Sequence, residues 1–188
     1  VALEAFNMTM QVTAITRRIN AIIPSIISQV TPSESSVIKR LAYEPLFLNH
    51  LRTNLGIEGI IKVSLHEPLT NLRKIVFIQM ERGTPTTEVW RALYGCAALQ
   101  SGVGKFIIAI NDDIDPNNGD AVFWALGYRC NPAIDCHILN NQGHGQGPQI
   151  QRAISEDSAL LIDATMKGPF PPLALPKKEY MENARRLW

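Results

Sequence analysis

The sequence predicts an α/β domain, a layered sheet covered by helices, because strand-like and helix-like segments alternate along the chain. The clearest example is an apolar strand at residues 74–80, a helix that opens at Thr84 and Pro85, and a short, nearly all-apolar strand at residues 105–110. Such a β-α-β unit is expected to have parallel strands and a right-handed crossover. The length of 188 residues and the hydrophobic content of 46% fit a single domain, residues 1–188, with its own core.

The first predicted element is a strand at residues 10–16, where apolar and polar side chains alternate and β-branched types are frequent. A helix is predicted to begin at Thr31, with Pro32 at its first position and Glu34 at its third, which is the pattern of a capping box. Such a box satisfies backbone donors that a helix leaves free at its start.

This helix has an apolar stripe made of Val37, Ile38 and Leu41, which we expect to be buried. Pro45 should kink or end the helix, because proline removes one backbone hydrogen bond and clashes with the preceding turn. A further turn or two is expected to run on to Asn54.

Two more helices are predicted in the middle of the chain. The helix that opens at Thr84 should bury Val89, Leu93 and Cys96, which recur at three- and four-residue spacing. Residues 120–128 are apolar nearly all round, which is typical of a helix buried on most sides. Such a helix suits an interface.

The remaining elements are strands at residues 59–65 and 159–164, an apolar segment at residues 135–139, a proline-rich linker at residues 169–176 and a terminal helix after it. The chain opens without an initiator methionine, and it stops inside the helical stretch without a capping glycine. We therefore expect it to be one domain cut from a longer polypeptide.

Composition bounds the possible partners. Eighteen Lys and Arg against seventeen Asp and Glu give a net charge of +1, and no basic run occurs, so nucleic-acid binding is not expected. Charged residues make up 19%, below the usual ~25%, which favours a surface that contacts protein. The apolar runs are too short for a membrane span. The cysteines Cys96, Cys130 and Cys136 fit reduced thiols in a cytoplasmic protein.

The densest polar cluster lies at residues 111–120, directly after a predicted parallel strand, where ligands bind in open α/β sheets. A calcium-binding module that uses Asp112, Asp113 and Asp115 is one hypothesis. Counting from Asp113, an EF-hand loop needs Gly at its sixth position and Glu at its twelfth, where this chain has asparagine and tryptophan. The competing interpretation is that these side chains cap the next helix.

A glycine-rich loop at residues 140–149 contains one titratable side chain, His144. Alternate glycines permit close approach to a ligand, but no phosphate-binding pattern matches, so a surface loop is the competing interpretation. The other histidines, His50, His66 and His137, are isolated in sequence and are predicted to be structural. No nucleophile elbow, Cys–His signature or spaced carboxylate pair identifies a catalytic centre.

Five stretches, taken in order, carry a more specific signal: residues 14–24, 32–34, 111–115, 122–132 and 161–165. The most specific part is the succession of Asp-Asp-Ile-Asp, Trp-Ala and Arg-x-x-Pro. Together they resemble the C-terminal half of the UbiD-type decarboxylases, and the resemblance covers nearly the whole chain.

The resemblance implies reversible loss or gain of CO2 on an aromatic or α,β-unsaturated carboxylic acid. In that family prenylated FMN carries the chemistry, with a divalent metal (Mn or Mg) and potassium, and the cofactor, metal and catalytic residues belong to an N-terminal flavin-binding domain. The last catalytic glutamate lies in a Phe-Gly-Glu motif, which this chain lacks. We therefore assign no catalytic, cofactor-binding or metal-binding residue to this chain and expect it to be inactive alone.

The resemblance also implies that this half pairs subunits, as in a homodimer, and supplies one wall of the substrate pocket. Lys39 falls near an apolar pocket position, where a lysine would bind an anionic substituent; an ordinary surface lysine is the competing interpretation. Leu126 aligns with an aromatic pocket residue, and the lost ring argues against a simple cinnamate substrate. The loop around His144 is expected to close the pocket. A non-catalytic subunit that scaffolds a separate catalytic polypeptide is the alternative function.

Overall fold

The computed structural model describes residues 10–25, 33–66, 74–100, 102–143, 157–171 and 174–188. Its elements in chain order are α1 (Glu34–Asn49), the π-helical turn η1 (His50–Asn54), β1 (Ile60–Leu65), β2 (Ile75–Met80), α2 (Thr86–Leu99), β3 (Phe106–Asn111), α3 (Gly119–Arg129), β4 (Cys136–Gln142), β5 (Asp157–Asp163) and α4 (Lys178–Leu187). The strands form one five-stranded sheet in the order β1-β2-β3-β5-β4. The predicted α/β class is confirmed.

Three central strands of the sheet are parallel. β2 pairs with β3 from Ile75↔Phe106 to Met80↔Asn111, and β3 pairs in parallel with β5. The edge strands β1 and β4 run antiparallel to their neighbours. The predicted β-α-β unit is therefore β2-α2-β3, and the carboxyl ends of β2, β3 and β5 meet at one edge.

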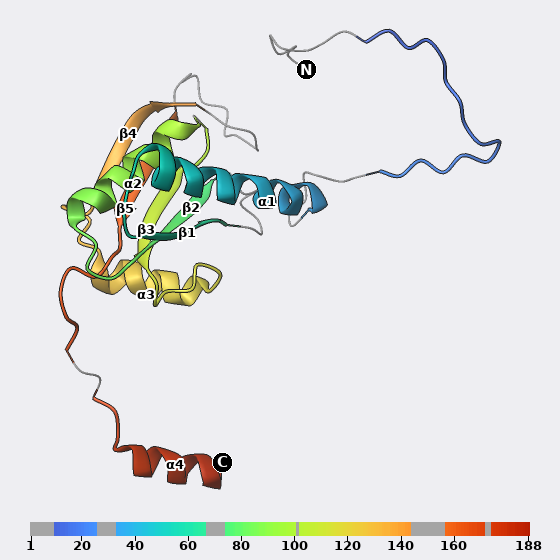
Figure 1. The fold of residues 1–188 in the computed structure, drawn as a ribbon. Helices are drawn as coiled ribbons and strands as arrows, with labels where there is room; N and C mark the ends of the chain where they lie inside the picture. The colour runs from blue at the N-terminus through green and yellow to red at the C-terminus, as the bar shows by residue number, and fades with distance from the viewer. Residues whose placement is uncertain (1–9, 26–32, 67–73, 101, 144–156, 172–173) are drawn as a thin grey trace.

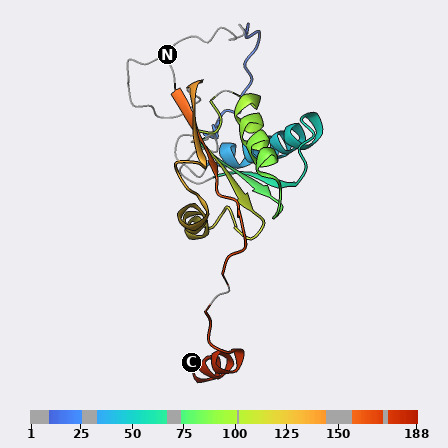
Figure 2. The same ribbon diagram turned by 90° about the vertical axis from the view of Figure 1, so that its left-hand side faces the viewer.

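Helices cover both faces of the sheet, as Figures 1 and 2 show: α1 and α2 lie on one face and α3 on the other. On the first face, the predicted stripe of α2 is buried, and Phe47 and Leu51 pack with it over the strands. On the second face, Val122 and Ala125 of α3 pack against Ile108 and Ile110 of β3. The architecture is a three-layer α/β/α domain.

The start of α1 differs from its prediction. Ser33 is the N-cap, and its hydroxyl and that of Ser36 form the capping box, so Glu34 is the first helical residue rather than the third. Thr31 and Pro32 lie outside the described residues. Pro45 does not end the helix, which continues to Asn49 and then into η1.

The α1 stripe, defined as Val37, Ile38 and Leu41, is exposed, so the prediction that it is buried was wrong. The exposed fractions of these residues are 50%, 67% and 75%. The reason is that α1 packs on the sheet through its later turns, around Phe47, whereas its first turns extend past the edge of the sheet in Figure 1. The described part of the chain provides nothing that covers this face.

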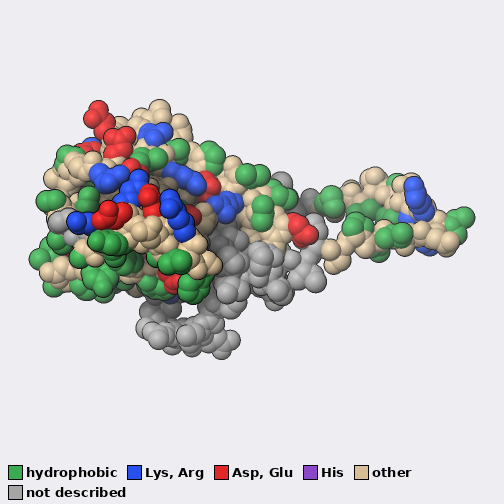
Figure 3. Space-filling view, turned by 90° about the horizontal axis from the view of Figure 1, so that it is seen from below, with side chains coloured by type: hydrophobic (Ala, Val, Ile, Leu, Met, Phe, Trp, Pro, Cys, Tyr) green, Lys and Arg blue, Asp and Glu red, His purple; other side chains and the backbone are tan. Residues whose placement is uncertain are grey.

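The predicted strand at residues 10–16 was also wrong. Residues 10–25 contain no helix or strand, and Ile15 and Ile19 are 83% and 95% exposed. A strand with one apolar face needs a neighbouring strand and a core beneath it, and the described residues supply neither at this point. In Figure 3 this stretch is the projection at the right, with hydrophobic side chains on its surface.

Helix α3 is buried on one side only, not on most sides as predicted. Phe123 and Tyr128 are 73% and 70% exposed, because α3 meets the sheet with one face and the described residues cover the other only in part. The terminal helix α4 forms as predicted and buries none of its side chains. Within the described ranges, no helix is long and apolar enough to cross a membrane.

Candidate functional site

Lys39 and Leu126, the two described residues that were predicted to line a substrate pocket, are not brought together within the described part of the chain. Lys39 is exposed on α1, and Leu126 is half-buried on α3, where it packs against the core on the opposite face of the sheet. His144 lies outside the described residues. A pocket shared by Lys39 and Leu126 therefore needs a further domain or chain, and their roles stay predictions.

The carboxyl edge of the parallel strands is tied together by Asn111, the last residue of β3. Its buried side-chain amide donates to the carbonyl oxygens of Met80 (3.3 Å) and Glu81 (3.4 Å). Its Oδ1 accepts a hydrogen bond of 2.6 Å from the backbone N–H of Met166. One amide thus joins the segments that follow β2 and β5, which fixes the edge where ligands bind in open α/β sheets.

A second polar group lies at the end of β5. Asp163 is fully buried, and its Oδ1 accepts hydrogen bonds from the Thr165 backbone N–H (2.9 Å) and hydroxyl (2.6 Å). Lys167 Nζ lies 3.2 Å from the same oxygen and 3.5 Å from Asp135 Oδ2, and it donates to the carbonyl oxygen of Arg129 (3.1 Å). The ammonium group offsets the charge of the buried carboxylate and holds the end of α3.

The strongest charged pair at this edge joins Arg129, in the last turn of α3, to Asp113. Two parallel hydrogen bonds link the guanidinium and the carboxylate, at 3.0 and 2.6 Å, and the Arg129 side chain is only 3% exposed. The guanidinium also lies over the rings of Trp124 (5.0 Å) and Phe170 (5.6 Å). The hydrogen bond from Arg129 lowers the pKa of Asp113 below its usual value.

The calcium hypothesis finds no support here. Asp113 is held by Arg129, Asp112 pairs with Arg82 at 3.0 Å, and Asp115 accepts hydrogen bonds from Asn117. Among the residues that the structure describes, no three His, Cys, Asp or Glu side chains are placed to hold a metal ion. The loop instead starts α3, as the competing interpretation predicted, although the N-cap is an amide, that of Asn118.

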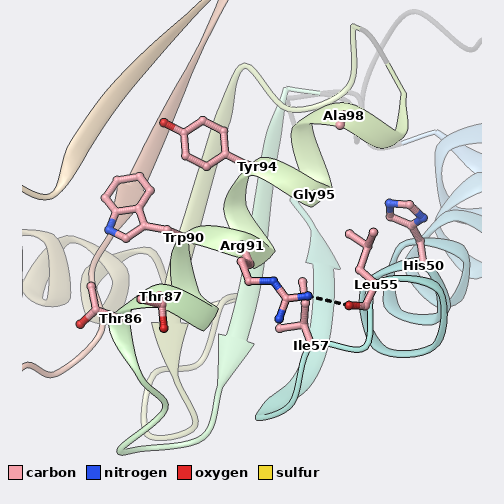
Figure 4. A pocket seen from close by; sticks show the side chains of 10 residues that line it. All are labelled: His50, Leu55, Ile57, Thr86, Thr87, Trp90, Arg91, Tyr94, Gly95 and Ala98. Atoms are coloured by element: carbon pink, nitrogen blue, oxygen red, sulfur yellow. Dashed lines mark hydrogen bonds between the residues drawn. The ribbon is translucent and has the colours of Figure 1, made fainter.

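A pocket of about 730 Å³ lies between η1 and α2, on the face opposite α3 (Figure 4). Arg91 and Leu55 face each other across it, and the Arg91 guanidinium donates to the Leu55 carbonyl oxygen at 2.8 Å. The walls are mainly apolar. The lining residues are His50, Leu55, Ile57, Thr86, Thr87, Trp90, Arg91, Tyr94, Gly95 and Ala98.

An aromatic cluster borders this pocket. The rings of Trp90 and His137 stack with centroids 3.9 Å apart, and Tyr94 Oη hydrogen-bonds to His137 Nδ1 at 2.8 Å. His137 is thus structural, as predicted, and it joins α2 to the edge strand β4. Sequence reasoning missed the pocket, because its two sides are distant in the chain; the available signal was the aromatic pair Trp90 and Tyr94 on the exposed side of α2.

These features define a class of protein. The described acidic side chains at the carboxyl edge are paired with basic groups or with their own loop, and the exposed surfaces of α1 and α3 are apolar. The class is a three-layer α/β/α domain with exposed apolar side chains on two of its helices, and its described residues include no cluster of metal-binding side chains.

The chain belongs to a particular family of such domains. The family model described as 3-octaprenyl-4-hydroxybenzoate carboxy-lyase C-terminal domain matches residues 36–164. This confirms the resemblance to the UbiD-type decarboxylases. None of the curated proteins matches this chain.

Solved structures of a UbiD-class enzyme and of two decarboxylases share the fold. HmfF from Pelotomaculum thermopropionicum, in complex with FMN, superimposes with a TM-score of 0.62 at 20% identity, over 81% of this chain and 34% of that one. Vanillic acid decarboxylase from Sedimentibacter hydroxybenzoicus, in closed form, gives 0.56 at 19% identity over 82% and 34%. The 3,4-dihydroxybenzoic acid decarboxylase of Klebsiella pneumoniae gives 0.54 at 14% over 79% and 33%. This chain spans about a third of their length.

Proposed function

We propose that this chain is the C-terminal domain of a UbiD-type carboxy-lyase, which reversibly decarboxylates an aromatic or α,β-unsaturated carboxylic acid with prenylated FMN. The observation that carries the proposal is the family match over residues 36–164. It is supported by two solved structures of HmfF, one in complex with FMN and one with prenylated FMN. We place the enzyme in the cytoplasm as a homodimer, in keeping with its three free cysteines and its apolar helix faces.

The described carboxylates of this chain do not form a site for a divalent metal. The carboxylate of Asp113 is held by Arg129, and that of Asp163 by Thr165 and Lys167. No cluster of metal-binding side chains occurs in the described ranges. We therefore assign the cofactor, the metal ions and the catalytic residues to an N-terminal flavin-binding domain, and no chemical step to this chain.

The α1 stripe supports the contact with that domain. Burying a valine, leucine or isoleucine side chain stabilises a protein by about 1.5–3 kcal/mol. The three side chains of the α1 stripe are half to three-quarters exposed, so covering them would add several kcal/mol of stability. The flavin-binding domain covers this face in our proposal. Lys39, one position beyond Ile38, then lies at the border of the contact and binds an anionic substituent of the substrate.

The activity is tested with the full-length protein that contains this chain, loaded with prenylated FMN. We expect CO2 release from at least one acid in a panel of aromatic and α,β-unsaturated acids, and none from the chain alone. Turnover by the chain alone, or no turnover of any acid by the loaded protein, would contradict the proposal. Co-purification with a separate flavin-binding polypeptide would favour the non-catalytic assembly subunit instead.

The role of Lys39 is tested in the same assay. Lys39→Ala should raise KM for acids that carry a second anionic group and leave KM unchanged for acids that carry only the carboxylate that is lost. Lys62→Ala is the matched control, because Lys62 is also exposed but lies on β1. Equal effects of the two variants would identify Lys39 as an ordinary surface lysine.

A further inference from the structure

Two of the three cysteines lie in contact. The Sγ atoms of Cys130 and Cys136 are 3.7 Å apart, and both residues are partly exposed. Cys130 caps the end of α3, and Cys136 is the first residue of β4. The third cysteine, Cys96, is buried in α2 on the other face of the sheet and belongs to a different core cluster.

The loop between the two thiols is closed by hydrogen bonds that do not involve sulfur. The backbone N–H of Asn131 donates to Asp135 Oδ2 at 2.7 Å, and the N–H of Asp135 donates to the Asn131 carbonyl oxygen at 2.7 Å. The N–H of Asp163 in β5 donates to the Asp135 carbonyl oxygen at 2.9 Å, which fixes the loop to the sheet. These hydrogen bonds hold the two ends of the loop close together without a contribution from either sulfur atom.

We propose that Cys130 and Cys136 are a redox modification site, at which a reversible intramolecular disulfide forms in the folded protein. The sulfur atoms must approach from 3.7 Å to a bond length of ~2.05 Å, a change within reach of side-chain rotation. This inference is independent of the proposed decarboxylase function.

The reaction needs an oxidant, which we identify by class as a peroxide or a small-molecule disulfide. With hydrogen peroxide, two S–H bonds and one O–O bond break, one S–S bond forms, and the two thiol hydrogens leave in two molecules of water. With oxidised glutathione, thiol–disulfide exchange releases two molecules of reduced glutathione. A dithiol reductant reverses both reactions.

The surroundings of the pair favour slow oxidation. Burial, and then the hydrogen bond with Cys136, raises the pKa of Cys130 to about 12, so this thiol is protonated near neutral pH. Because the thiolate is the nucleophile, the rate of oxidation should rise about tenfold per pH unit while the attacking thiol is mostly protonated. The disulfide would tie the end of α3, beside the buried Arg129, to β4.

Trypsin gives a direct readout in the full-length protein. Cleavage at Arg129 and Arg152 leaves both cysteines on one peptide, residues 130–152, whereas Cys96 lies on the peptide of residues 92–105. The folded protein is treated with hydrogen peroxide or oxidised glutathione, acid-quenched, unfolded, alkylated with iodoacetamide and digested. We expect the 130–152 peptide to carry no alkyl group and to be two hydrogens lighter than its dithiol form, and to carry both alkyl groups when dithiothreitol is added before alkylation.

Single variants make the test specific. Cys130→Ser and Cys136→Ser should each keep the remaining cysteine of the peptide alkylated after oxidation, whereas Cys96→Ser should behave like the unaltered protein. Far-ultraviolet circular dichroism verifies that each variant is folded. The proposal is overturned if the 130–152 peptide stays doubly alkylated, if the bond links two chains, or if Cys96 takes part.

Discussion

Replacing Asp113 with asparagine tests the charged pair that holds the end of α3. The change removes a carboxylate that accepts two hydrogen bonds from Arg129, whose side chain is 3% exposed. Hydrogen bonds to charged groups contribute ~1.5–3 kcal/mol each. The Asp113 side chain is 32% exposed, so water compensates in part, and the amide keeps one acceptor. We expect the free energy of unfolding to fall by about 2 kcal/mol, a Tm lower by about 4–8 °C.

The effect should depend on pH in a defined direction. The hydrogen bond from Arg129 depresses the pKa of Asp113 in the folded state, so its stabilisation is fully present above the unfolded value of ~3.9 and is lost as pH falls through the folded value. Urea unfolding curves of the two proteins should therefore differ at pH 7 and converge in acid.

Asp112→Asn is the matched control for this prediction. Asp112 precedes Asp113 in the same loop, but both partners of its ion pair are exposed: the Asp112 side chain is 42% exposed and the Arg82 side chain 54%. Such pairs contribute ~0.2–1 kcal/mol. Equal losses for the two variants, or a difference for Asp113→Asn that persists below its folded pKa, would refute the assigned role of the Arg129 pair.

Three further predictions concern other parts of the fold. Gly95→Ala puts a Cβ 2.5 Å from the Leu55 side chain and 3.1 Å from the buried Leu51 side chain, and it should lower the free energy of unfolding in urea by about 1–3 kcal/mol. Gly127→Ala, with nothing within 4 Å, should be neutral or stabilising. Ser33→Ala removes the N-cap of α1 and should lower the unfolding free energy by about 1 kcal/mol. Changing the α1 stripe to serine should leave the Tm of the isolated chain within ~2 °C but weaken its binding to the flavin-binding domain in calorimetry; unchanged binding would contradict our proposal for α1.

The sequence predicted those parts of the fold that depend on local patterns. The strands of residues 74–80 and 105–110 and the helix between them formed as expected, because an all-apolar strand and a three-to-four-residue stripe each identify an element buried by its neighbours. The α1 stripe shows the limit of this reasoning. An amphipathic pattern tells which side of a helix is apolar, but not whether the partner that covers it belongs to the same domain.

The site was harder to predict, because its contacts join residues that are distant in sequence. One of the two interpretations of the polar loop at residues 111–120, that its side chains cap the next helix, agrees with the structure, although the cap is the amide of Asn118 rather than a carboxylate. The pairing of Asp113 with Arg129 and the contact between Cys130 and Cys136 depend on how α3 lies against the sheet, which no spacing rule encodes. The resemblance to the family came from motifs in a fixed order, and the family match bears it out.

The coding sequence upstream of Val1 decides whether this chain is part of a larger enzyme. Our account predicts that the reading frame continues upstream through a flavin-binding domain and encodes the Phe-Gly-Glu motif shortly before residue 1, since the chain covers only 34% of the HmfF polypeptide. A start codon immediately before Val1, with no flavin-binding domain in the same polypeptide, would contradict it.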